Sequence, residues 1–350
     1  MTNTISVLIV TWNSESYIGS CLQSLVSSEG RPLEIIVIDN CSVDGTAEIV
    51  RGYSRVELIA TETNLGFAPA MNIALRRAQG RFLCMLNPDT EVSPTALDHL
   101  ADVLEQNALA AAVGPSLLDD KGEVLPTSAR SLPSLWECFA RQFGLAKAFP
   151  TLLPQGHVTR RRFVGHPPVS VPAISGATLM LRRSVFEETG PLDETIPMYF
   201  EDLDYCARLC RKGHVCWVPE AVVFHSGAKS ADAAPARKLL YAMEDGEAPF
   251  LFFKRYRSNI SARLFVFITL FGSMFRVCLL FPVFCVARFG GLRIGTKFQG
   301  TLSKAAALLW WSISPTRCVQ ARIREFFGRT DRSQLERSSL LPKESTEGAS

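Results

Sequence analysis

Two carboxylates in the first ninety residues stand directly after apolar runs, a position where acidic side chains often bind ligands. Asp39 follows the run Glu34–Ile38, and Asp89 follows the run Arg81–Leu86 by way of Asn87-Pro88. A carboxylate at the first position can accept a hydrogen bond from a base N–H or a ribose hydroxyl, and one at the second can hold a divalent cation that neutralises a diphosphate. No G-x-G-x-x-G motif follows the first apolar run and no Walker lysine loop occurs, so a glycine-rich phosphate cradle is not expected.

The segments that must position these carboxylates alternate between strand and helix signals. The run Ile5–Val10 is apolar except at Ser6, which is typical of a parallel strand buried on both faces. The alternation continues to about residue 90, with further strands expected at 34–38, 56–60 and 81–86 and helices at 14–28, from 42, and at 66–79. This order predicts a doubly wound α/β sheet with helices on both faces. Additional strands of a mixed sheet are expected at 110–118, 174–181 and 214–224, and residues 130–172 are expected to form long loops with short helices.

Polar residues cluster where the predicted strands end. The clusters are Thr11-Trp12-Asn13, Asp39-Asn40, Asn64-Leu65-Gly66-Phe67 and Asn87-Pro88-Asp89. Ligands of open α/β sheets bind outside the C-terminal ends of the strands, near the switch in strand order. The sequence therefore predicts one ligand site at this edge of the sheet.

Eight short motifs occur in a fixed order: TWNS, IDNCSVDGT, NLGFAPAMN, LNPDTEV, SGATLMLRR, GPLDE, YFEDLDYCAR and HSGAKS. Each is weak alone, but together they resemble family 2 glycosyltransferases of the GT-A fold, especially the rhamnosyltransferase-like bacterial branch. The resemblance covers about residues 4–230. It implies a GT-A type, Rossmann-like doubly wound mixed sheet and an inverting sugar transfer assisted by Mg²⁺ or Mn²⁺. The implied donor is a nucleotide-diphosphate sugar, with dTDP-L-rhamnose first and UDP-hexoses next.

The resemblance assigns seven residues to the nucleotide-sugar pocket. Thr11, Asn13 and Asp39 would hold the nucleoside, with Asp39 facing the pyrimidine base or the ribose. The others would shape the rest of the pocket; they are Asn64, Gly66, Asn72 and Asn87.

The resemblance also implies a metal site. Asp89 matches the final acid of the family's D-x-D motif, whose first acid is replaced here by Asn87. His225 matches a late histidine that completes the metal site in many GT-A enzymes. A mixed set of carboxylate, imidazole and diphosphate ligands suits Mn²⁺.

The Glu201-Asp202 pair is the second chemical centre that the resemblance implies. An inverting transferase needs one general base beside the acceptor hydroxyl, and the resemblance gives this role to Asp202. A helix N-terminus at this point would favour the ionised carboxylate. Glu201 would bind acceptor or sugar hydroxyls, and Lys229 or Arg130 would add positive charge near the leaving diphosphate.

The charge distribution divides the chain into an acidic body and a basic end. The whole chain carries a net charge of +3, too small to suggest a nucleic-acid partner, whereas residues 251–350 hold 16 Lys and Arg against 5 Asp and Glu, a net +11. Residues 264–287 are nearly all apolar but contain Arg276 and Pro282, which fits an interfacial or re-entrant helix pair at least as well as a clean span. A helix packed on the catalytic body is the alternative that needs no membrane.

These observations predict a catalytic domain over 1–235, a basic and hydrophobic helical membrane-associating region over 236–325, and a disordered tail over 326–350. The start of the chain has no basic n-region, so no secretory signal is expected, and the ten cysteines are expected as free thiols. We expect an enzyme at the cytoplasmic side of the inner membrane, peripheral or shallowly inserted, that extends a glycan or lipid-linked acceptor. Two alternatives are a catalytically silent sugar-nucleotide-binding subunit and a sugar-phosphate nucleotidyltransferase. The second would need a glycine-rich phosphate loop near residue 11, which the sequence does not have.

Overall fold

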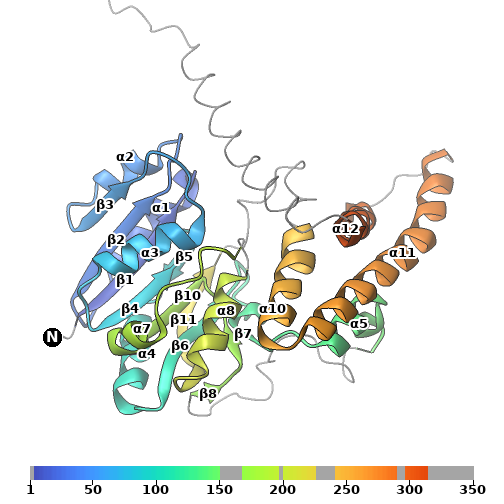
Figure 1. The fold of residues 1–350 in the computed structure, drawn as a ribbon. Coiled ribbons are helices and arrows are strands. Elements are labelled where there is room, and N and C mark those ends of the chain that lie inside the picture. Colours follow the sequence, from blue (N-terminus) through green and yellow to red (C-terminus); the bar gives the residue numbers. More distant parts are fainter. Residues whose placement is uncertain (1–3, 150–167, 197–199, 226–240, 290–295, 314–350) are drawn as a thin grey trace, which may run out of the picture.

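The computed structural model describes residues 4–149, 168–196, 200–225, 241–289 and 296–313 (Figure 1). The predicted tail over 326–350 and Lys229 lie outside the described residues. So does the stretch 150–167 of the segment expected as long loops.

A nine-stranded mixed sheet forms the centre of the described chain (Figure 1). Eight strands follow the order β3-β2-β1-β4-β10-β6-β11-β5, and the ninth, β8, pairs with β11. Strands β3, β2, β1 and β4 are parallel, whereas β10 runs antiparallel to both of its neighbours. The strands of this sheet are β1 (Ile5–Thr11), β2 (Leu33–Asp39), β3 (Val56–Ala60), β4 (Phe82–Leu86), β5 (Thr90–Val92), β6 (Ala110–Leu118), β8 (Val169–Ser170), β10 (Thr178–Arg182) and β11 (His214–His225).

A two-stranded ribbon and a set of helices complete the described fold. The ribbon pairs β7 (Ala129–Arg130) with β9 (Ala173–Ile174) in antiparallel orientation. The α-helices described in the first 225 residues are α1 (Glu15–Val26), α2 (Thr46–Arg51), α3 (Phe67–Arg77), α4 (Ala96–Gln106), α5 (Leu135–Gln142), α6 (Leu145–Ala148), α7 (Arg183–Thr189) and α8 (Glu201–Leu209), and a short 3-10 helix covers Pro126–Ser128. After them come a π-helical turn (Met243–Glu247), α10 (Ala248–Tyr256), α11 (Asn259–Phe289) and α12 (Thr296–Ile313).

The core has two layers because successive strand residues point to opposite faces of the sheet. Leu8 of β1 packs into the cluster that contains α3 and α8, while Val7 packs into the cluster that contains α1 and α4. All seven residues of β1 are buried. This two-sided burial explains why the strand is read as a continuous apolar run, and it confirms the predicted doubly wound mixed sheet.

Two strand predictions differ from the structure. The strand expected at 174–181 is divided: Ile174 ends β9 of the ribbon, and Thr178 begins β10 of the main sheet. The three residues between them approach helix α8, as described below. The short strand β5 was not predicted, because a three-residue strand carries too little periodicity to be recognised.

The apolar C-terminal segment forms one continuous helix, α11. The sequence had left a membrane span, an interfacial or re-entrant helix pair and a helix packed on the body as alternatives. By length and composition α11 is the one helix among the described residues that could cross a membrane. Helix α10, which precedes it, packs into the main core through Ala248 and Phe252. Helix α10 therefore contributes side chains to the core beneath the sheet.

Candidate active site

The ends of five strands form the candidate site. Strand β1 lies between β2 and β4 with all three parallel, so the residues that follow them share one edge of the sheet. The backbone N–H of Asn87 donates to the carbonyl of Ala177, 2.9 Å away, which places the residues before β10 beside the end of β4. His225, at the end of β11, pairs with Thr90 of β5. The topology thus brings to one edge motifs that are as far apart in the chain as those of Thr11 and His225, as expected for an open α/β sheet.

The predicted nucleoside end is organised by Asp39. Its Oδ1 accepts hydrogen bonds from the hydroxyls of Thr11, at 3.1 Å, and Ser42, at 2.5 Å. The side chains of Asp39 and Thr11 are buried, with Asp39 3% exposed. The carboxylate therefore fixes the turn after β2, and among the described residues its Oδ2 accepts only a 3.3 Å contact from the backbone N–H of Ser42.

Asn13 and Asn64 hold the adjacent loops. Asn13 has a left-handed backbone, with φ of 51°, a conformation that asparagine tolerates better than most residues. Its Oδ1 accepts from the backbone N–H of Val43 at 2.9 Å. The Oδ1 of Asn64 accepts from the side chain of Asn40 and from the backbone N–H of Gly66. Both predicted residues therefore lie at the strand ends and shape the loops there.

Asn72 shapes the site indirectly. It lies on α3 and is fully buried, and its Nδ2 donates to the carbonyl of Leu192 and to Oε1 of Glu194, each at 2.9 Å. Its Oδ1 accepts from the backbone N–H of Leu192. Because these contacts use both its amide and its carbonyl group, Asn72 anchors the 192–194 loop.

Asp89 and His225 lie together, as a shared ligand site requires. The Nε2 of His225 is 3.3 Å from Oδ1 of Asp89, and both side chains are mostly buried. The Nδ1 of His225 is buried and has no hydrogen-bond partner among the described residues. No group of three or more His, Cys, Asp or Glu that could hold a metal occurs in the part of the chain that the structure describes, so any further ligands would have to come from elsewhere.

Asp202 is held by three donors at the start of α8. Its Oδ2 accepts from Nη2 of Arg130 at 2.8 Å and from the backbone N–H of Gly176 at 3.1 Å, and its Oδ1 accepts from the backbone N–H of Leu203 at 2.7 Å. A carboxylate has about four acceptor positions. The remaining position, on Oδ1, is the one that an incoming hydroxyl could use.

Glu201 adjoins Asp202, and the pKa of its carboxyl group is raised. Burial, together with the neighbouring charge of Asp202, raises the pKa of Glu201 from its ordinary value of 4.5 to about 7. Its Oε2 accepts from the backbone N–H of Phe200 at 2.9 Å. Near neutral pH the carboxyl group therefore exists in both protonation states and can either donate to or accept from a hydroxyl.

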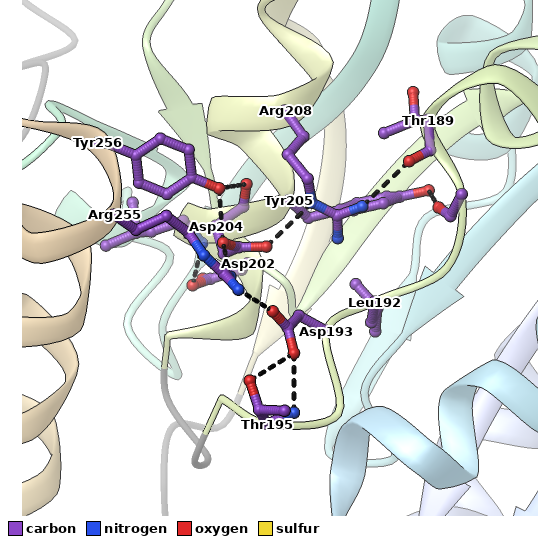
Figure 2. Close-up of polar contacts among 12 residues, drawn as sticks. Thr189, Leu192, Asp193, Thr195, Asp202, Asp204, Tyr205, Arg208, Arg255 and Tyr256 are labelled. Carbon is purple, nitrogen blue, oxygen red and sulfur yellow. Dashed lines mark hydrogen bonds and ion pairs between the residues drawn. The ribbon is translucent and has the colours of Figure 1, made fainter.

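A buried ionic cluster fixes the orientation of α8 (Figure 2). The Asp204 carboxylate is 1% exposed; it accepts from Arg208 Nε at 3.0 Å, Arg255 Nη1 at 2.9 Å and the Tyr256 hydroxyl at 2.6 Å. Arg255 also pairs with Asp193 on the loop that Asn72 anchors. The cluster therefore links α10, α8 and the 193–195 loop.

Sequence reasoning missed two residues of this arrangement, Gly176 and Arg255, and it missed one contact of a third. Arg130, expected to add positive charge near the leaving diphosphate, pairs with Asp202 in the structure. Gly176 lies in the SGAT motif, and a Cβ there would be 3.1 Å from the Cβ of Asp202, so its lack of a side chain permits the close approach. Because Gly176 belongs to one of the eight motifs, the sequence could have marked it as a site residue, whereas Arg255 lies in none of the motifs.

Comparison with known proteins identifies the family. The sequence model of glycosyl transferase family 2 matches residues 6–190. The chain is 31% identical over 255 residues to the N-acetylglucosaminyl-diphospho-decaprenol L-rhamnosyltransferase of Mycobacterium tuberculosis, covering 68% of this chain and 81% of that protein. It is 26% identical over 218 residues to a low-salt glycan biosynthesis hexosyltransferase of Haloferax volcanii, covering 61% of this chain and 63% of the relative.

A solved structure has the same fold. The mannosyltransferase of Pyrobaculum calidifontis, in complex with GDP-Man and Mn²⁺, aligns with a TM-score of 0.54 and 16% identity over 89% of this chain and 87% of its own. At this identity the likeness concerns the fold. The family match and the 31% identical relative identify the activity class: the chain is a glycosyltransferase and belongs to glycosyl transferase family 2.

Proposed function

We propose that the protein is an inverting glycosyltransferase that moves a sugar from a nucleotide-diphosphate donor to a hydroxyl of a lipid-linked or other cell-surface glycan acceptor. The observation that carries this proposal is the convergence, at one edge of the sheet, of the Asp39 turn, the Asp89–His225 pair and the Asp202 carboxylate. dTDP-L-rhamnose is the first candidate donor, supported by the L-rhamnosyltransferase relative, and UDP-hexoses are next.

The residues present fit a divalent metal ion, Mg²⁺ or Mn²⁺. Asp89 supplies a carboxylate, and His225 supplies an imidazole whose Nδ1 lacks a partner among the described residues. Diphosphate oxygens would complete such a mixed set. When bound, the ion would neutralise the negative charge that develops on the leaving diphosphate.

Asp202 would act as the general base toward the acceptor hydroxyl. Arg130 and the backbone N–H of Gly176 hold its Oδ2 and leave a position open on Oδ1. A base held in one orientation can take the proton as the acceptor oxygen attacks the anomeric carbon on the face opposite the leaving diphosphate. Glu201, with a pKa near 7, would bind a hydroxyl of the acceptor or of the transferred sugar.

We further propose that the protein acts at the cytoplasmic side of the inner membrane. Its basic, apolar C-terminal helices support attachment to a membrane surface. A polyprenyl-diphosphate-linked sugar would be presented at such a surface, and the M. tuberculosis relative is named for an acceptor of this kind.

Thermal unfolding of the full chain with nucleotide sugars tests the donor assignment. dTDP-L-rhamnose, UDP-hexoses and GDP-mannose are each added with Mn²⁺, with Mg²⁺ or with EDTA. A ligand present at 100 times its Kd stabilises the folded protein by about 2.7 kcal/mol, so we expect the preferred donor to raise the Tm by roughly 5–10 °C when metal is present.

The transfer itself is measured with a radiolabelled sugar of that donor and a polyprenyl-diphosphate-linked acceptor in detergent. Accumulation of labelled lipid is expected. If no nucleotide sugar stabilises the protein under any metal condition, the proposed function is wrong.

A further inference from the structure

Helix α11 has two distinct faces. One face is packed against α5, α10 and α12, and its residues Ala262, Phe265, Thr269 and Ser273 are buried. The other face exposes large apolar side chains along the whole helix. We call this second face the α11 ridge; its residues are Leu264, Phe267, Phe271, Phe275, Leu279 and Val286, each 47–72% exposed.

The packed face is tied to α5 and to a charged cluster. A Cβ on Gly272 would lie 2.6 Å from the Cβ of Gln142, so the two helices touch at their backbones, and Arg276 donates to the carbonyl of Arg141. Arg141 also forms an ion pair with Asp245, 3.1 Å apart. The body surface beneath α11 therefore carries charges that hydrocarbon would not accept without a large cost.

These contacts decide between a span and an in-plane helix. A bilayer has a hydrocarbon core of about 30 Å and needs about 20 helical residues to cross it. The part of α11 beyond Arg276 is residues 277–289, which at about 1.5 Å per residue reaches only about 20 Å. A span would therefore have to use residues 262–276 and carry α5 and its charges into the hydrocarbon.

The charge of the region identifies what covers the ridge. Between Glu247 and Glu325 the sequence contains twelve Lys and Arg and no Asp or Glu. A symmetric dimer through the ridge would bring together two copies of this cationic segment, whereas an anionic leaflet complements its charge, at about 1 kcal/mol per cation near the surface. An exposed row of aromatic residues beside cations is typical of a helix lying in the membrane interface.

A second row of aromatic rings extends the ridge toward the catalytic carboxylate. Trp136, which is 54% exposed, stacks on Phe139 with ring centroids 5.7 Å apart, and Phe143 continues the row to Phe275 of α11. Helix α5, which holds the first two rings and ends just before the third, begins five residues after Arg130, the partner of Asp202. A leaflet that covers the ridge would thus contact the helix that begins shortly after the Arg130 partner of Asp202.

We infer that the protein is monotopic: the α11 ridge, extended by Trp136, inserts in plane into one anionic leaflet, and no part of α11 crosses the bilayer. This inference rests on the membrane attachment in the proposed function and specifies its geometry. In this geometry the head group of a lipid-linked acceptor would reach Asp202 from the leaflet in which the ridge lies, without crossing the bilayer.

Vesicle binding tests the ridge in the full-length protein. Phe271→Ser is compared with Leu109→Ser, which removes an apolar side chain that is 67% exposed on a loop before β6. We expect Phe271→Ser to weaken co-sedimentation with phosphatidylglycerol vesicles on the order of 10- to 100-fold, and Leu109→Ser to bind like wild type. Equal binding of both variants, or a wild-type protein that dimerises and does not bind vesicles, would overturn the inference.

Protease accessibility tests the topology. A protease site is inserted between residues 292 and 293, and a control site between Asp120 and Lys121, in an exposed turn of the body. In sealed, inverted inner-membrane vesicles we expect both sites to be cut without detergent. Cleavage at 292 only after detergent would show that α11 crosses the bilayer, while the donor-dependent Tm shift of the same protein would show that the proposed function stands.

Discussion

Asp204→Ala should destabilise the protein strongly. The Asp204 carboxylate is 1% exposed and accepts from Arg208, Arg255 and the Tyr256 hydroxyl (Figure 2). Removing it leaves two guanidinium groups without their shared anion. Breaking a buried ion pair in this way costs about 3–5 kcal/mol. The side chain of Arg255 is 45% exposed and that of Arg208 is 22% exposed, so both retain contact with water, and we expect a loss of about 3 kcal/mol, at the lower end of that range.

Urea unfolding followed by circular dichroism measures this loss. If the slope of the unfolding free energy against urea concentration is unchanged, the substitution has altered stability alone. Asp204→Asn keeps the shape and some of the hydrogen bonds, so a smaller loss of about 1–2 kcal/mol is expected. The matched control is Glu48→Ala, which removes an exposed partner of Arg51 at 3.3 Å and should change stability by less than about 0.5 kcal/mol. A loss below about 1 kcal/mol in Asp204→Ala would refute the view that this cluster attaches α10 to α8.

Three further predictions concern the site. Asp202→Asn should lower the transfer rate on the order of 10²- to 10⁴-fold and leave donor affinity unchanged, because a general base would contact the acceptor and not the donor. Initial rates measure the first effect and donor titration the second. Activity near that of wild type would show that Asp202 is not the general base. Asp89→Ala should abolish the increase in donor affinity on adding Mn²⁺, which calorimetric titration detects; a persisting increase would mean that Asp89 is not a ligand. Because the pKa of Glu201 is raised to about 7, its stabilising contribution is complete below about pH 4.5 and is lost as the pH rises through 7. The stability of wild type relative to Glu201→Gln should therefore fall by roughly 2–3 kcal/mol between these pH values in urea unfolding, and a difference independent of pH would contradict this assignment.

Local pattern in the sequence predicted the parallel half of the sheet well. Strands such as β1 are buried on both faces, so apolar residues predominate along them, and the polar clusters after them mark where each strand ends. The same rule places Asp39 and Asp89 at one edge of the sheet from the order of the apolar runs alone. The family resemblance then implied that His225, far along the chain, belongs beside Asp89, and Nε2 of His225 lies 3.3 Å from Oδ1 of Asp89.

Only the tertiary structure decided the contacts between segments whose sequences carry no mutual signal. Arg130 lies in a weakly periodic segment, and its pairing with Asp202 depends on how the β7–β9 ribbon packs against α8. The attachment of α10 through Arg255 likewise results from packing between distant elements. The sequence also left open whether the apolar segment 264–287 spans a membrane, lies in its interface or packs on the body. Its composition is the same in all three cases, and only the placement of its neighbours shows which face is covered and which is free.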